Sequence, residues 1–135
     1  MATYITAQGN EYVAPLASDS GNVFGVFGSY SLSGLQADDI IVFVKVPRGA
    51  KVLSCCVATD GDTSGGTMNL GVLGDDDFFA ADIALDGARH ETIKTPVEFN
   101  MDDEQYIVGK ITAAGTAMND KTVSVTILYT LSNIA

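Results

Sequence analysis

The sequence predicts an all-β protein, an antiparallel β-sandwich of about eight strands arranged as a jelly roll. Short segments rich in β-branched and aromatic residues recur along the chain at intervals of roughly 8–12 residues. Turn residues separate these segments, and the chain contains 14 glycines and 3 prolines. No window longer than a turn or two has the period of a helix. A length of 135 residues fits a single sandwich domain.

The expected strands follow one another from residue 22 to residue 131. The segment "IIVFVKV" is a nearly continuous β-branched run, as in a strand that is buried on both faces. The segment "PRGA" then forms a turn, because Pro47 restricts φ and Gly49 is conformationally free. The segments predicted to be strands are 22–32, 40–46, 51–58, 67–73, 78–85, 96–101, 105–112 and 121–131.

Residue alternation predicts which side chains form the core. It is clearest in "KTVSVTILYTL", where large apolar residues alternate with threonine and serine, as in a strand with one buried and one wet face. The same two-residue period, applied to the other predicted strands, gives the remaining core residues. The predicted core residues are Ile40, Val42, Val44, Leu70, Val72, Val123, Val125, Ile127 and Tyr129.

The charge balance limits the partners that the chain can bind. It carries 7 basic and 17 acidic residues, a net charge of −10, whereas binding to nucleic acid requires lysine and arginine to neutralise phosphates. The same acidity disfavours an anionic membrane surface, and no apolar run approaches the ~18 residues that span a bilayer. The N-terminus has neither the basic region nor the apolar stretch of a secretory signal, so we expect synthesis and folding in a cytoplasm. The expected partner is another protein.

The residues that could support catalysis do not form a recognisable set. His90 is the only histidine, and no GxSxG motif accompanies it. The adjacent cysteines, Cys55 and Cys56, have Cα atoms about 3.8 Å apart, too close for a relaxed disulfide. They are predicted to be small buried apolar residues. We therefore predict a protein that is not an enzyme and that binds no cofactor.

The run Asp75–Asp77 has three interpretations: a structural corner, a calcium site or catalytic carboxylates. Calcium requires 6–8 oxygen ligands, and carboxylates on consecutive residues do not all converge on one ion. The structural interpretation is favoured: a one-turn helical corner over 75–80, capped by aspartate, with Phe78 or Phe79 closing one end of the sandwich. Calcium is the remaining alternative, and we predict no metal ligands here.

The first 22 residues differ from the rest of the chain. They are polar, small and aperiodic, so they are predicted to form an N-terminal arm (1–22) outside a sandwich domain (23–135). The arm is either a frayed end or a segment that becomes ordered on a partner. In the second case its scattered apolar residues would be the contacts, namely Tyr4, Ile5, Tyr12 and Val13.

Three stretches of the chain resemble a known family. They are "ADDIIVFVKVPRGAKVLSCCVA", "TMNLGVLGDDDFFAADIA" and "YIVGKITAAGTAMNDKTVSVTILYTL". Together they are similar to the small jelly-roll capsid decoration proteins, also called cement or head-stabilising proteins, of tailed bacteriophages. The recurring features map to Val44–Leu53, Leu70–Phe79 and Val123–Leu131, and the resemblance covers roughly residues 38 to 131.

The resemblance implies a homotrimer on the outer surface of a virion, where it binds the major capsid protein and stabilises the shell by bridging neighbouring subunits. The segment 51–58 is apolar on both faces and must be covered twice, so the expected trimer contacts are Leu53, Cys55 and Val57. The alternative is a carbohydrate- or receptor-binding β-sandwich module on a virion fibre. Such a module would need clustered exposed aromatic residues, for which Tyr4, Tyr12 and Tyr30 are the candidates.

Overall fold

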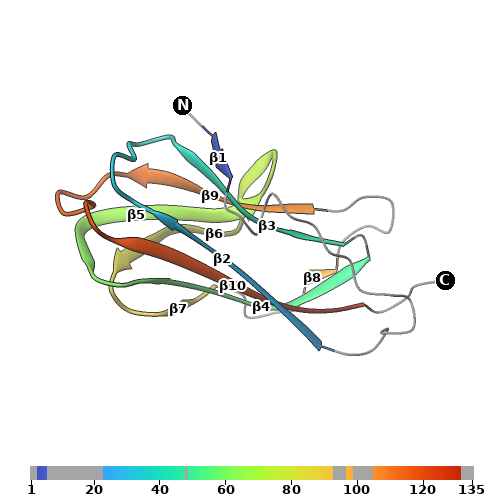
Figure 1. Ribbon diagram of the computed structural model, residues 1–135. Coiled ribbons are helices and arrows are strands. Elements are labelled where there is room, and N and C mark those ends of the chain that lie inside the picture. Colours follow the sequence, from blue (N-terminus) through green and yellow to red (C-terminus); the bar gives the residue numbers. More distant parts are fainter. Residues whose placement is uncertain (1–2, 6–22, 48, 93–96, 99–104, 132–135) are drawn as a thin grey trace.

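The chain folds into two packed β-sheets, which confirms the predicted antiparallel sandwich (Figure 1). The computed structural model describes residues 3–5, 23–47, 49–92, 97–98 and 105–131. These residues contain no helix, and so none that is long and apolar enough to cross a membrane. The strands are β1 (Thr3–Ile5), β2 (Val23–Ser31), β3 (Ile40–Val46), β4 (Ala50–Thr59), β5 (Asp62–Val72), β6 (Asp75–Asp86), β7 (His90–Glu91), β8 (Val97–Glu98), β9 (Gln105–Ala113) and β10 (Thr122–Leu131).

The strand order makes the chain cross repeatedly between the sheets. One sheet has the order β1-β3-β9-β5-β6, and the other has the order β2-β10-β4-β7, with β8 also paired to β4. All the strand pairs are antiparallel except the short β1, which runs parallel to β3. Without β1 and β8, the orders 3-9-5-6 and 2-10-4-7 are those of an eight-stranded jelly roll.

The core lies between the two sheets, and β10 contributes to it as alternation predicts. Val123, Val125 and Ile127 are completely buried, and Tyr129 is almost so. The Tyr129 ring packs against Phe24 of β2, with 5.6 Å between ring centroids. The threonine and serine residues of β10 therefore lie on the outer face of the sheet.

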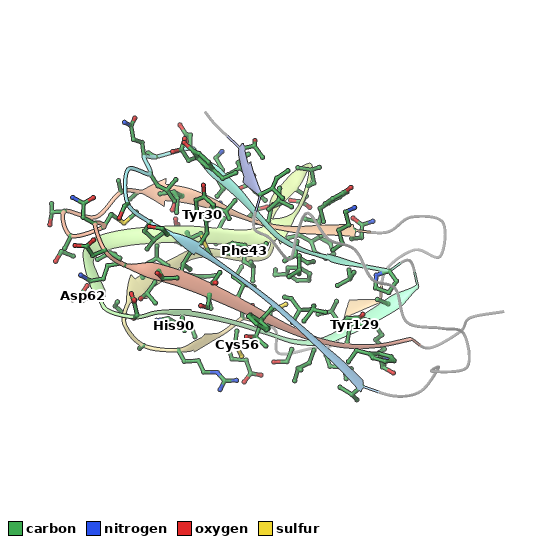
Figure 2. The ribbon with its side chains drawn as sticks, in the orientation of Figure 1. Tyr30, Phe43, Cys56, Asp62, His90 and Tyr129 are labelled. Atoms are coloured by element: carbon green, nitrogen blue, oxygen red, sulfur yellow. The ribbon has the colours of Figure 1, made fainter. Side chains whose placement is uncertain are left out.

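The predicted register of β3 is wrong by one residue in its first half. Ile41 and Phe43 are the side chains that enter the core, whereas Ile40 is only half-buried. Phe43 is labelled in Figure 2. The register shifts between Val42 and Val44, so Val44 returns to the core as predicted. A continuous apolar run contains no alternation that fixes which parity faces inward, and a bulge changes that parity within the strand. Val42 is buried but does not belong to the core between the sheets.

Candidate interaction surfaces

The strands β2 and β10 form an uncharged outer face on the sandwich. They pair over their whole length in one unbroken register, and neither contains a charged residue. We call this surface the β2–β10 face. Its residues are Val23, Gly25, Phe27, Ser29 and Ser31 of β2 and Thr122, Ser124, Thr126, Leu128 and Thr130 of β10.

Large apolar side chains project from the β2–β10 face. Val23 is 61% exposed, Phe27 is 58% exposed and Leu128 is 40% exposed. Leu128 lies over Gly25, because a Cβ atom added to that glycine would be 3.3 Å from Leu128 Cδ2. Single exposed apolar residues are ordinary, but a group on adjacent strands without charges is typical of an interaction site.

The outer face of the other sheet has a different chemistry around β5, β6 and β9. The Asn69 amide nitrogen donates to Asp76 Oδ2 at 2.8 Å, and Asn69 Oδ1 accepts from the Asp82 backbone N–H at 2.9 Å. Thr112 Oγ1 lies 2.7 Å from Thr67 Oγ1 and donates to Asp82 Oδ1 at 3.1 Å. These polar groups are satisfied within the chain, so this part of the outer face is polar and carries aspartates, whereas the β2–β10 face has no charged residue.

The run Asp75–Asp77 begins strand β6, so the predicted helical corner is wrong. Gly74, at φ 96°, turns the chain directly from β5 into β6. Leu70 then pairs with Ala80 and Val72 with Asp75, which leaves Gly71 alone opposite residues 76–79. The extra residues of β6 arch over Gly71 as an irregular bulge, and the Asn69 side chain holds them there.

The two phenylalanines after the run have different environments. Phe79 packs against the core, and Phe78 is 43% exposed beside it, with 5.1 Å between their ring centroids. Of the two residues predicted to close the end of the sandwich, Phe79 is therefore the one in contact with the core.

Electrostatic repulsion within the run affects Asp75. A hydrogen bond with Asp77, followed by burial and by the negative charges of Asp77 and Asp76, raises the pKa of Asp75 above its usual range. The folded state therefore holds this proton more tightly than the unfolded state does. By linkage, the contribution of Asp75 to the free energy of unfolding falls as the pH rises from the pKa of this carboxyl group in the unfolded chain through its raised pKa in the folded protein.

We predict that Asp77→Asn raises the melting temperature at pH 7, because it removes one of the repelling charges. The gain should shrink below about pH 4, where carboxyl groups are largely protonated, and in high salt. Asp120→Asn is the control, since it makes the same charge change at an exposed residue outside the run. An equal gain in both variants, or a gain independent of pH, would contradict the prediction. Thermal unfolding followed by circular dichroism measures both variants.

His90 and Cys56 each make a side-chain hydrogen bond to a neighbouring residue. His90 Nε2 lies 2.8 Å from Asp86 Oδ1, and this hydrogen bond is the main cause that holds the pKa of Asp86 below its usual range. The Arg89 guanidinium donates to Cys56 Sγ at 3.1 Å, which ties the β6–β7 connection to β4. Among the described residues, no group of three or more His, Cys, Asp or Glu side chains is arranged to hold a metal ion.

The structure separates the three residues predicted as trimer contacts. Cys55 and Val57 are completely buried in the core between the sheets, so neither side chain can contact another subunit. Burial raises the pKa of the Cys55 thiol to about 12. Leu53 is half-buried, next to a register shift between β4 and β10. The shift reverses which alternate residues of β4 face inward. Strict alternation ignores this reversal, and it therefore placed Leu53 on the same face as Cys55 and Val57.

The predicted capsid contacts of the arm are placed only in part. Tyr4 and Ile5 belong to β1, which pairs with the edge of β3, so this part of the predicted arm is a strand of the sandwich. Tyr4 packs against Tyr30, with 5.5 Å between ring centroids, while Ile5 is more than half exposed. Tyr12 and Val13 lie outside the described residues, as does most of the predicted arm. Of the three tyrosines considered for sugar binding, the two that the structure describes, Tyr4 and Tyr30, are half-buried against each other and do not form an exposed platform.

The exposed apolar residues of the β2–β10 face were missed by alternation. A signal was available, because Leu128 stands among threonine and serine residues on the wet side of its strand. The absence of charge from both strands was a second signal. Neither signal locates a surface until the pairing of β2 with β10 brings Val23, Phe27 and Leu128 together.

The fold and this surface together define a jelly-roll β-sandwich with an uncharged outer face from which three large apolar side chains project. No protein-family model matches the chain, and no curated protein matches it either. It is similar in structure to a chain of the capsid asymmetric unit of cyanophage Pam1, with a TM-score of 0.69 and 21% identity over 90% of this chain and 93% of that one.

Two further capsid chains are similar to it. One belongs to the capsid of Ralstonia phage GP4, with a TM-score of 0.70 and 20% identity over 98% of this chain and 99% of that one. The other comes from the acid-stable capsid of Helicobacter pylori bacteriophage KHP30, with a TM-score of 0.67 and 14% identity over 86% of this chain and 93% of that one. At these identities the likeness establishes the fold.

Proposed function

We propose that the chain is a virion structural protein without enzymatic activity, which decorates the outer surface of a phage capsid and stabilises it by bridging major capsid subunits. One observation carries this proposal: the likeness to the three capsid chains covers almost the whole of each of them. The chains are therefore of similar size to this one. A capsid chain that consists of one small sandwich and little else has the size of an accessory component.

The charge of the protein favours a place on the outside of the shell. A net charge of −10 repels packaged nucleic acid, which a protein lining the interior would face. An acidic exterior also keeps the assembled particle soluble. The uncharged β2–β10 face then provides a surface on which this acidic chain can contact other proteins.

The proposed oligomer is a homotrimer, in which one particle-bound unit contacts several capsid subunits at once. Three linked binding sites bind far more tightly than one, because the second and third contacts are intramolecular. Of the expected trimer contacts only Leu53 stays in this proposal, since Cys55 and Val57 are in the core. Tyr4, Ile5, Tyr12 and Val13 stay as proposed contacts of the N-terminal region with the major capsid protein.

Capsids of the phage that encodes this chain, assembled without it, test the proposal directly. We expect the purified protein to bind them in multiples of three copies per site and to raise the temperature at which they disrupt. Sedimentation measures binding and copy number, and a dye-release assay measures disruption. The double variant Tyr12→Ser with Val13→Ser leaves β1 unchanged, and it should weaken binding if the N-terminal region contacts the shell. Failure of the wild-type protein to bind such capsids would refute the proposed function.

A further inference from the structure

Strand β2 is a long, regular edge strand. Among the described residues it pairs with β10 alone, over nine consecutive partners and without a register shift. It contains no charged residue and no proline. Natural sandwiches usually protect such an edge, because its unpaired N–H and C=O groups accept a strand from another chain.

The hydrogen-bonding direction of each β2 residue follows from one bond just beyond the strand. The Leu32 N–H donates to Lys121 O at 2.8 Å, and these residues continue the register of β2 and β10. In an antiparallel pair the backbone groups of successive residues point alternately toward and away from the partner. The N–H and C=O groups that point away from β10 are therefore those of Val23, Gly25, Phe27, Ser29 and Ser31.

The other described edges of the sandwich are less suited to receive a strand. Strand β6 is also long, but it contains five aspartates, several register shifts and Asp82 at a positive φ of 54°. Charges and bulges of this kind block the addition of a strand. The remaining described edges are short: they are formed by β1, β7 and β8, which have 3, 2 and 2 residues, and by the parts of β3 and β4 that extend beyond them. Among the strands that the structure describes, only β2 is an edge that combines length, regularity and absence of charge.

We propose that the β2 edge receives an extended segment of another capsid chain, which adds to the sheet as a further strand. This inference rests on the proposed function and names the contact through which the protein would bind the shell. A row of alternating backbone donors and acceptors is matched by an extended polypeptide. The added strand would place apolar side chains beside Val23 and Phe27, which supplies the burial that these two residues lack.

A second copy of this chain is the less suitable occupant. Pairing β2 with the β2 of another copy creates a two-fold axis, which makes a dimer and not the proposed trimer. A head-to-tail ring would instead have to join β2 to a different edge, and the other long edge strand among the described residues is the acidic β6. Each copy also carries a charge of −10, which opposes self-association.

Two variants of the edge test the proposal on capsids assembled without the protein. Ser29→Pro removes an N–H that points away from β10, so it blocks an added strand without breaking the β2–β10 ladder. Phe27→Lys places a charge on the edge and removes an exposed ring. We expect each to weaken binding to the capsids by at least about tenfold, a change of about 1.4 kcal/mol. The melting temperature and the oligomeric state should stay unchanged.

Thr126→Lys is the matched control. Thr126 pairs with Phe27 and lies on the same outer face, but its strand is internal to the sheet. If an edge strand is added, this lysine should have much less effect than Phe27→Lys. Hydrogen exchange gives an independent measurement. On the capsid, the amides of Gly25, Phe27, Ser29 and Ser31 should become protected, whereas the other amides of β2, which point toward β10, should be protected already in the free protein.

Each other outcome overturns the inference. Equal loss of binding in Thr126→Lys, with Ser29→Pro unaffected, would mean that the partner binds the β2–β10 face and not the edge. A change of oligomeric state in the edge variants would identify a second copy as the occupant. Protection of the edge amides in the free protein would mean that its own chain covers the edge. Normal binding by both edge variants would refute the inference while the proposed function stands, whereas failure of wild-type binding refutes both.

Discussion

Phe43→Ala is expected to lower the free energy of unfolding by about 3–5 kcal/mol, the usual cost of removing a large buried aromatic side chain. Phe43 is completely buried between the sheets. Its ring fills the space beside Gly109, since a Cβ atom on that glycine would lie 2.7 Å from Phe43 Cε2. The close packing leaves little freedom for the neighbours to collapse into the cavity. Urea denaturation of the purified variant measures the change.

Phe78→Ala is the control for this prediction, because the same side-chain change is made at a ring that is 43% exposed on the edge strand β6. Its cost should be a small fraction of that of Phe43→Ala. Similar losses in the two variants would mean that the Phe43 ring is no more deeply packed than the Phe78 ring, which would contradict its place in the core.

Gly71→Ala should be the second damaging change, with an expected loss of at least about 1–3 kcal/mol from overpacking. A Cβ atom at this position would lie 2.2 Å from the backbone oxygen of Asp75 and 2.6 Å from the carbonyl carbon of Asp76. Backbone atoms cannot rotate away as a flexible side chain can. The variant must therefore displace the acidic bulge of β6 from the sheet, together with the hydrogen bond from Asn69 to Asp76.

Gly25→Ala provides a matched comparison within a strand. The nearest obstacle to its added methyl group is Leu128 Cδ2 at 3.3 Å, the mobile end of a side chain. Replacing glycine by alanine within a strand is also favourable for the backbone. We expect its stability to stay within about 0.5 kcal/mol of the wild type. If Gly71→Ala were equally mild, the bulge would not rest on Gly71.

Alternation predicts a strand correctly where one of its faces is wet. In β10, each inward residue is large and apolar and almost every outward residue is threonine or serine, so the parity is unambiguous. In β3 and β4, both parities are apolar, and a register shift in each strand reverses the direction of the side chains. The local sequence does not specify this reversal of side-chain direction, because the reversal depends on how the neighbouring strands pair.

The acidic run shows the same limit for local structure. Aspartates before an apolar pair favour a helix cap when the chain is considered alone. In the structure the run instead begins a strand. Gly74 turns the chain back along β5, Gly71 has no side chain to obstruct the run, and the Asn69 amide donates a hydrogen bond to Asp76. Gly71 and Asn69 lie on β5, the strand opposite the run, so the pairing of the two strands decides between two conformations that are both locally acceptable.

The sequence by itself determined the all-β class, the approximate positions of the strands, the inner face of β10 and the strongly acidic character of the protein. These properties follow from composition and from the two-residue period of a strand, which act over a few residues. The tertiary structure alone decided which residues share an outer face. Leu128 is separated from Val23 and Phe27 by about a hundred residues of chain, and the three become one surface because β2 pairs with β10. Which edge of a sheet stays unpaired is likewise a property of strand order, and strand order depends on long-range packing that no local pattern encodes.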